Sequence, residues 1–226
     1  MLIQHLDPFA SSLFSFLAIA TLLLSFVMLG SRWLKNYLYA FAAESWMIAL
    51  LSVTAAFFGH YPELYGIAAL TLVFRGIVLP VLLWRIIRRL NVDREIHAVL
   101  QPSSGIVIGA LFVIFAFAVS FRVTERLDVE MSITVLALTV MLSMNLIGFL
   151  ILAVRYEAMS QVLGLLVLEN GVQIGAQILV PGMPLLLELV FLFDLLVVVA
   201  CFGVLVRFLE THAGTTSTLA LKRLVG

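Results

Sequence analysis

The sequence is poor in charged residues. Only 12% of its 226 residues are Asp, Glu, Lys or Arg, whereas 63% are hydrophobic. A typical soluble domain has about 25% charged and roughly 45–50% apolar residues. A chain of this composition cannot cover its surface with polar side chains, so the composition excludes a soluble globular domain and predicts a membrane protein.

Cysteine and histidine are also scarce. The single cysteine, Cys201, lies in an apolar run and has no second thiol with which to pair, so we interpret it as a packing residue. No pair of histidines is placed to ligate a haem within a bilayer, because all four fall at segment ends or in loops: His5, His60, His97 and His212. We expect no redox centre, no metal and no other cofactor in this chain, and no catalytic centre.

Long apolar runs dominate what is present. Each is long enough to cross a bilayer, which takes about 20 helical residues, and none shows the alternating pattern of a membrane strand. No Lys or Arg precedes the first run, so we expect that run to be a retained helix and not a cleaved signal peptide. The prediction is an all-α, polytopic membrane protein with about seven transmembrane helices, at residues 9–29, 38–58, 64–84, 105–121, 132–154, 161–180 and 185–208.

Lys and Arg are distributed unevenly over the predicted loops. One side has only Arg122 and Arg126, and Arg75 lies inside a predicted helix. Cytoplasmic loops are enriched in Lys and Arg, so this bias predicts an outside N-terminus and a cytoplasmic C-terminus. The ten residues of the basic side are Arg32, Lys35, Arg85, Arg88, Arg89, Arg94, Arg155, Arg207, Lys222 and Arg223.

Two parts of the chain resemble each other. Residues 34–51 and 159–176 each follow a short basic turn and place a glutamate, Glu44 or Glu169, about a third of the way into a helix. Parallel repeats of this kind occur in membrane proteins, although any seven-helix chain offers similar windows by chance. The predicted organisation is an N-terminal three-helix unit with a basic loop (1–101), a spacer helix (102–131) and a C-terminal three-helix unit (132–226).

Polar residues form one stripe in the sixth predicted helix. Glu169, Gln173 and Gln177 recur every four residues and share a helical face, with Asn170 beside them. Amides hydrogen-bond across membrane helices, which is our interpretation of Gln173, Gln177 and also Asn145. A buried carboxylate can in addition take up and release a proton, so we interpret Glu169 as a proton relay residue.

Three further acidic residues and one arginine lie in or near predicted spans. Asp194 and Glu44 are candidate relay residues, whereas Arg75 cannot lose its charge and needs a buried acid beside it. We expect that acid to be Glu44, with Asp194 as the other candidate. Glu188 follows a Pro-Gly turn, and for it a capping role and a role in proton entry stay open.

Three stretches of the C-terminal half carry a family resemblance. "LENG" at 168–171, "PLLLELVFLFD" at 184–194 and the tail "THAGTTSTLALKRLVG" at 211–226 resemble component E of hydrogenase 4, a family of membrane subunits of formate hydrogenlyase-type, group 4 nickel–iron hydrogenase complexes. The last three helices also look like the K subunit of complex I. The match covers the whole chain in helix layout and is specific from about Arg155 onward.

This resemblance implies roles for two acids. Glu169 matches the acid of the K subunit's second helix, and Asp194, which is shorter than glutamate, matches the acid of its third helix. In the family these acids continue a polar axis along which redox energy drives proton or sodium movement. Glu44 and Arg75 lie outside the matching part, so no family role passes to them.

The expected function is that of a non-catalytic subunit of a complex-I-like respiratory assembly. Its partners would be antiporter-like membrane subunits and a redox arm in the inner membrane of a bacterium or archaeon, with no nucleic acid. One alternative is a structural adaptor whose buried charges only lock helices together. Another is a self-sufficient transporter, for which the sequence offers little beyond "LVPGMP" at 179–184.

Overall fold

The computed structural model describes residues 8–90, 100–127, 131–155 and 158–179, with the single positions 189 and 193. Each apolar run in these ranges forms a helix, because the chain satisfies its own backbone hydrogen bonds only that way in an apolar surrounding. The elements are α1 (Pro8–Gly30), α2 (Leu34–Gly59), α3 (Glu63–Leu70), η2 (Thr71–Val78), α4 (Leu79–Leu90), α5 (Pro102–Leu127), α6 (Met131–Val154) and α7 (Ala158–Leu179).

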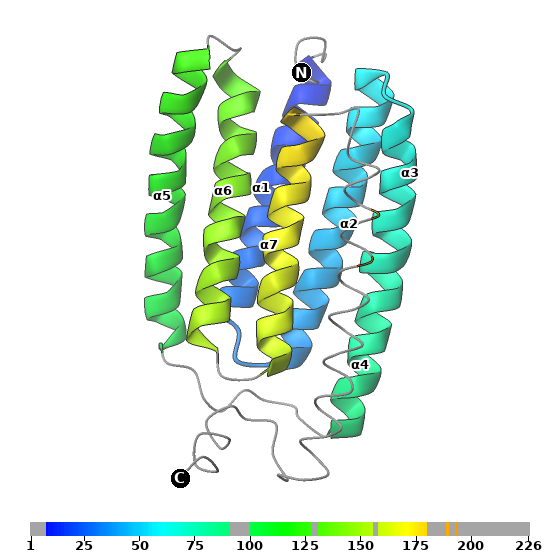
Figure 1. Ribbon diagram of the computed structural model, residues 1–226, viewed down its shortest axis with the longest axis vertical. Coiled ribbons are helices and arrows are strands. Elements are labelled where there is room, and N and C mark those ends of the chain that lie inside the picture. The colour runs from blue at the N-terminus through cyan, green and yellow to red at the C-terminus, as the bar shows by residue number, and fades with distance from the viewer. Residues whose placement is uncertain are drawn as a thin grey trace.

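The all-α prediction is confirmed for the part of the chain that the structure describes, and the first six predicted segments each coincide with a helix. The third is one continuous rod built of α3, η2 and α4 (Figure 1). Within the described ranges, five helical spans are long and apolar enough to cross a membrane, and α7, with its polar residues, is not among these five. The prediction of seven spans is thus met only in part, and the seventh, 185–208, lies almost wholly outside the described residues.

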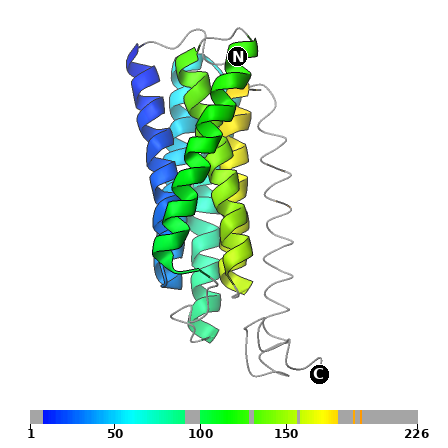
Figure 2. The same ribbon diagram turned by 90° about the vertical axis from the view of Figure 1, so that its left-hand side faces the viewer.

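The helices form an upright bundle in which successive rods run in opposite directions (Figure 1). The rod α3–η2–α4 lies on one flank, and α5 lies on the other, against α1 and α6 (Figure 2). Between them, α7 packs on both α6 and α2. The helix α7, which carries the polar stripe, therefore lies inside the bundle.

One end of the bundle collects the basic residues, and we call it the basic end. It holds the α1–α2 and α6–α7 connections, the end of α4 and the start of α5 (Figure 1). Arg122 and Arg126 lie near the opposite end of α5. The basic residues that the charge bias grouped together thus lie at the same end as far as they belong to the described residues, while Arg94, Arg207, Lys222 and Arg223 lie outside them.

Arg155 at the basic end is a buried residue and not a solvated loop charge. Its Nη2 donates hydrogen bonds to the carbonyl oxygens of Leu29 at 3.1 Å and Ser31 at 2.8 Å, and its guanidinium lies over the ring of Tyr37. These carbonyls belong to the last turn of α1 and the residue after it, where helix carbonyls have no partner within the helix. Arg155 therefore fastens the start of the α6–α7 connection to the end of α1.

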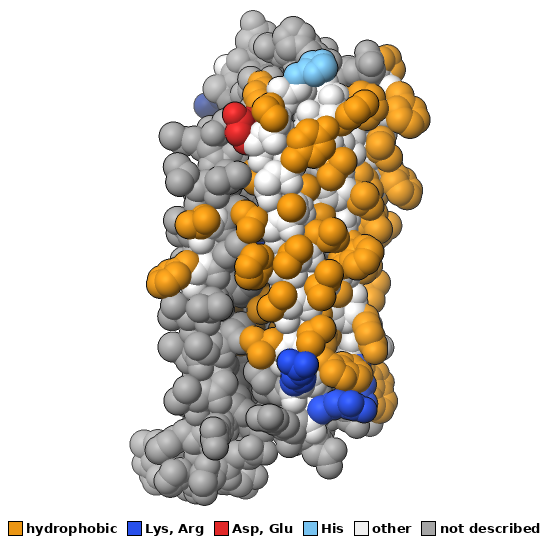
Figure 3. Space-filling model, turned by 90° about the vertical axis from the view of Figure 1, so that its right-hand side faces the viewer, with side chains coloured by type: hydrophobic (Ala, Val, Ile, Leu, Met, Phe, Trp, Pro, Cys, Tyr) orange, Lys and Arg blue, Asp and Glu red, His pale blue; other side chains and the backbone are white. Residues whose placement is uncertain are grey.

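Apolar side chains cover the outside of the bundle. On the flank formed by α2, α3 and α4, they fill the area between a histidine at one end and Lys and Arg at the other (Figure 3). Among them, Phe57 is 64% exposed and Ile77 is 48% exposed. Soluble monomers rarely expose apolar patches of this size, so this surface fits the lipid of a multi-pass membrane protein.

Glycines let α6 and α7 approach each other closely. A Cβ atom on Gly148 would lie 2.8 Å from the carbonyl oxygen of Gly164, and one on Gly171 would lie 3.1 Å from the carbonyl oxygen of Met141. Small residues at such interfaces allow close backbone contact in membranes, where no hydrophobic effect drives helices together. The glycine side of α7 therefore faces α6. As a result, the polar side of α7 faces α2 and η2.

The segment η2 is a π-helix of eight residues that contains Arg75. At its end the backbone N–H of Leu79 donates to the carbonyl oxygen of Phe74, five residues earlier. The indole Nε1 of Trp46 on α2 donates to the carbonyl oxygen of Gly76 at 3.2 Å. π-helical turns are rare and are often found at functional sites.

Trp46→Phe is expected to lower the free energy of unfolding by about 0.5–1.5 kcal/mol, the usual net contribution of one hydrogen bond. Phenylalanine keeps an aromatic ring but removes the N–H that reaches Gly76. Denaturant unfolding of the purified protein in detergent, followed by circular dichroism, measures the change. Leu50→Phe, at another half-exposed position of α2, is the control, and an equal loss in both variants would show that the bond to Gly76 contributes nothing.

The predicted repeat stays a prediction. The described elements begin and end close to the predicted unit boundaries, since α5 spans Pro102–Leu127 and α6 begins at Met131. In the second unit, however, the helix that would correspond to α3–η2–α4 lies almost wholly outside the described residues.

Candidate functional site

A layer of polar side chains lies inside the apolar bundle, contributed by α1, α2, η2 and α7. We call it the polar layer, and its members are all buried: Ser25, Glu44, Ser52, Thr71, Arg75, Glu169, Asn170, Gln173 and Gln177. Four of them come from the polar stripe of α7. The stripe faces α2 and η2, as its hydrogen bonds to both elements show.

Arg75 is the centre of the polar layer. It is fully buried and donates three hydrogen bonds to α7, from Nη1 to Asn170 Oδ1 at 2.8 Å and Gln173 Oε1 at 3.2 Å, and from Nη2 to Glu169 Oε2 at 3.3 Å. The last of these is an ion pair. A guanidinium group only donates, so three acceptors on one helix face are a fitting environment for it.

The expectation that Glu44 pairs directly with Arg75 is wrong. The described carboxylate in salt-bridge reach of Arg75 is Glu169. Asn170 lies between Glu44 and Arg75 and forms a hydrogen bond with each of them, so the link between these two side chains runs through the amide. The other candidate partner, Asp194, and likewise Glu188, lie outside the described residues.

Asn170 connects the two buried acids through Arg75. Its Nδ2 donates to Glu44 Oε2 at 2.9 Å, and its Oδ1 accepts from Arg75. A carboxamide has both a donor and an acceptor, which is what this position between an acid and a base requires. The hydrogen-bonded chain therefore runs from Glu44 through Asn170 and Arg75 to Glu169.

Glu44 is held on its other side by α1. Ser25 Oγ lies 2.7 Å from Glu44 Oε1 and donates to it. Ser25 Oγ is also 3.2 Å from the carbonyl oxygen of Thr21, one turn earlier in α1. The carboxylate of Glu44, which is fully buried, thus accepts one hydrogen bond at each oxygen, and both donors are uncharged groups.

The amides of α7 extend the polar layer away from the basic end. Gln173 Nε2 donates to Thr71 Oγ1 at 2.7 Å, and Gln177 Nε2 donates to Ser52 Oγ at 2.7 Å. At 1.5 Å per helical residue, the stripe from Glu169 to Gln177 covers about 12 Å along the bundle. Asn145 behaves differently from these amides, because its Nδ2 donates to the carbonyl oxygen of Met141 in its own helix.

The hydroxyl residues of the polar layer were missed by the sequence reasoning. Ser25, Ser52 and Thr71 look like other Ser and Thr residues in these helices, and many of those simply bond to a carbonyl one turn earlier, as Ser45 and Thr139 do. Nothing in the sequence distinguishes the hydroxyl groups that bond to another helix from those that bond within their own helix. Only the neighbouring helix decides which hydroxyl meets a polar partner.

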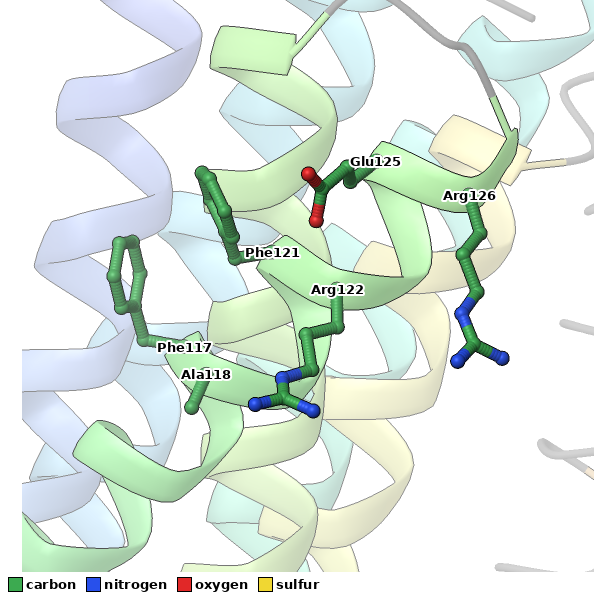
Figure 4. A pocket seen from close by; sticks show the side chains of 6 residues that line it. All are labelled: Phe117, Ala118, Phe121, Arg122, Glu125 and Arg126. Atoms are coloured by element: carbon green, nitrogen blue, oxygen red, sulfur yellow. The ribbon is translucent and has the colours of Figure 1, made fainter.

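Two other features bear on what the described residues can bind. No group of three His, Cys, Asp or Glu residues that could hold a metal ion occurs among them. The surface has an open hollow of about 540 Å³ on α5, lined by Phe117, Ala118, Phe121, Arg122, Glu125 and Arg126 (Figure 4). This helix contributes no residue to the polar layer.

Comparison with known proteins finds a relative in Mycobacterium tuberculosis. The chain is 32% identical over 160 residues to the uncharacterized protein Rv0085 of Mycobacterium tuberculosis (strain ATCC 25618 / H37Rv), and the match covers 70% of each chain. The chain belongs to the same family as Rv0085. No protein-family model and no solved structure matches it.

Proposed function

We propose that this protein is a non-catalytic membrane subunit of a complex-I-like, hydrogenase-4-like respiratory assembly, and that its buried acids form part of a proton or sodium path. The polar layer is the observation that carries the proposal. Two carboxylates and an arginine are joined there through an amide, deep in a bundle of apolar helices. Ionisable groups in such a place are costly and mark ion pathways in membrane proteins.

The proposal assigns the chemistry as follows. Glu44, Glu169 and Asp194 exchange protons, Arg75 supplies a fixed positive charge, and Gln173 and Gln177 orient waters or side chains along the stripe, because amides do not hold a charge. Electron transfer takes place in a redox arm formed by other subunits. In this arrangement the basic end faces the cytoplasm, as the enrichment of Lys and Arg in cytoplasmic loops requires.

A structural adaptor is the second candidate, and one observation favours it. Every hydrogen bond described for Arg75, Asn170 and Gln173 joins one helix to another, so the polar layer also locks η2, α2 and α7 together. Interhelical bonds of this type stabilise membrane proteins by about 0.6–2 kcal/mol each.

Glu169→Gln separates the two candidates. Glutamine keeps the size of the side chain and an oxygen for Arg75 but cannot titrate, so we expect an assembled complex whose ion uptake is reduced. Uptake is not abolished, because Glu44 and Asp194 still exchange protons. The measurement is redox-driven proton or sodium uptake by vesicles that contain the complex.

The control is Gln161→Glu, which adds a carboxylate to the same helix near the basic end, outside the polar layer. It should leave uptake unchanged. Wild-type uptake with glutamine at position 169 would contradict a relay role for Glu169, and wild-type uptake in Glu44→Gln as well would leave the adaptor.

A further inference from the structure

The two buried acids of the polar layer have different hydrogen-bond partners. Glu169 Oε2 faces the guanidinium of Arg75, which only donates and always carries its charge. A proton placed on that oxygen would point at another positive donor. The contact with Arg75 therefore favours the ionised form of Glu169, because a fixed positive charge beside a carboxyl group stabilises its negative form.

The partners of Glu44 suit both of its forms. When Glu44 is ionised, Ser25 donates its hydroxyl proton to Oε1 at 2.7 Å. When Oε1 carries a proton, that proton can be donated to Ser25 Oγ, since a hydroxyl also accepts, and the hydroxyl proton of Ser25 can turn to the carbonyl oxygen of Thr21 at 3.2 Å. Asn170 Nδ2 donates to Oε2 in either case.

The charges around Glu44 agree with this difference. At the polar layer α1 provides only hydroxyl groups, η2 provides Arg75, and α7 provides Glu169. The charged residues of α3 and α4, such as Glu63 and Arg85, lie at the ends of the rod. Among the described residues of the polar layer, Arg75 lies near two carboxylates, and its ion pair is with Glu169. A proton on Glu44 removes the second negative charge of this described group without breaking the ion pair.

We infer that Glu44 is the acid that exchanges the proton in the polar layer, that Ser25 is its switching partner, and that Glu169 is the lasting counter-ion of Arg75. The step is a simple uptake: a proton binds Glu44 Oε1, and the Ser25 hydroxyl turns from Glu44 to Thr21. Release reverses it. This inference deepens the proposed function, because it reassigns the exchanging group within the same path.

Infrared difference spectroscopy of the full-length protein in lipid nanodiscs tests the inference. A protonated carboxylic acid has a carbonyl stretch that is absent from the ionised form and shifts in D₂O. We expect one component of this band to titrate in the wild type and in Glu169→Gln and to be missing from Glu44→Gln, whereas components from other acids, such as Asp194, stay in all three. A band that persists in Glu44→Gln but is lost in Glu169→Gln would overturn the inference.

Ser25→Ala provides a second test that leaves both acids in place. Without the hydroxyl acceptor, the band of Glu44 should move to a different frequency. Ser45→Ala is the matched control, since Ser45 is a buried serine next to Glu44 that donates to Phe41 in its own helix. A band that is unmoved by Ser25→Ala, or moved equally by both changes, would refute the switching role of Ser25.

These results are separable from those for the proposed function. One outcome is that the band belongs to Glu44 but the assembled complex with Glu44→Gln takes up ions at the wild-type rate. In that case the inference about Glu44 stands, and the proposed ion path through the polar layer is wrong. If the band belongs to Glu169, the inference fails and the path can still stand.

Discussion

Arg75→Leu is expected to destabilise the folded protein by about 3–5 kcal/mol, the cost of removing one partner from a buried ion pair. Leucine leaves the carboxylate of Glu169 without its counter-ion in an apolar bundle and takes the donor from two amide oxygens, on Asn170 and Gln173. We therefore expect little folded subunit in the membrane. Denaturant unfolding in detergent and the yield of folded protein measure the effect.

Two variants show whether the loss comes from the charge. Arg122→Leu removes an exposed arginine near the end of α5 and should change stability by less than about 0.5 kcal/mol. The double variant Arg75→Leu with Glu169→Leu should recover part of the loss, since replacing both members of a buried pair is often close to neutral. Wild-type unfolding of Arg75→Leu would show that the ion pair is unnecessary for the fold.

Gly148→Ala is expected to destabilise the protein by about 1–3 kcal/mol, the usual cost of overpacking. The added Cβ would lie 2.8 Å from the carbonyl oxygen of Gly164 and 2.9 Å from the backbone N of Leu168. Both are backbone atoms of α7, so relief requires that the whole helix move. Such a shift would also pull the polar stripe away from Arg75.

Gly105→Ala is the matched control for that change. Its Cβ would lie 3.6 Å from the side chain of Leu29, an ordinary contact. Alanine in a helix interior is about 0.5–1 kcal/mol more favourable than glycine, so this variant should be as stable as the wild type or more so. The same unfolding measurement serves both variants, and equal behaviour of the two would contradict close α6–α7 packing as the cause.

Local patterns in the sequence predicted the helices well. Apolar runs of bilayer length placed the ends of the first six to within six residues, and the period of Glu169, Gln173 and Gln177 predicted one polar face on α7. The grouping of basic residues also agrees with the end of the bundle at which the described ones lie (Figure 1). Each of these properties depends on residues that are close together in the chain.

Contacts between distant helices could not be predicted in this way. The sequence suggested Glu44 as the partner of Arg75, whereas the structure places Glu169 there and Asn170 between the two. It counted Arg155 among the loop charges, although this residue is buried against the end of α1. The π-helical form of η2, which contains Arg75, was also not predicted from the sequence.

The sequence by itself determined that this protein is helical and apolar, and it determined which face of α7 is polar, because composition and helical period act within a single segment. The tertiary structure alone decided what that face meets. Many arrangements of the same helices would bury the same stripe. The close backbone contact at Gly148, Gly164 and Gly171 turns α7 so that Glu169 reaches Arg75, and this leaves Glu44 to the hydroxyl of Ser25.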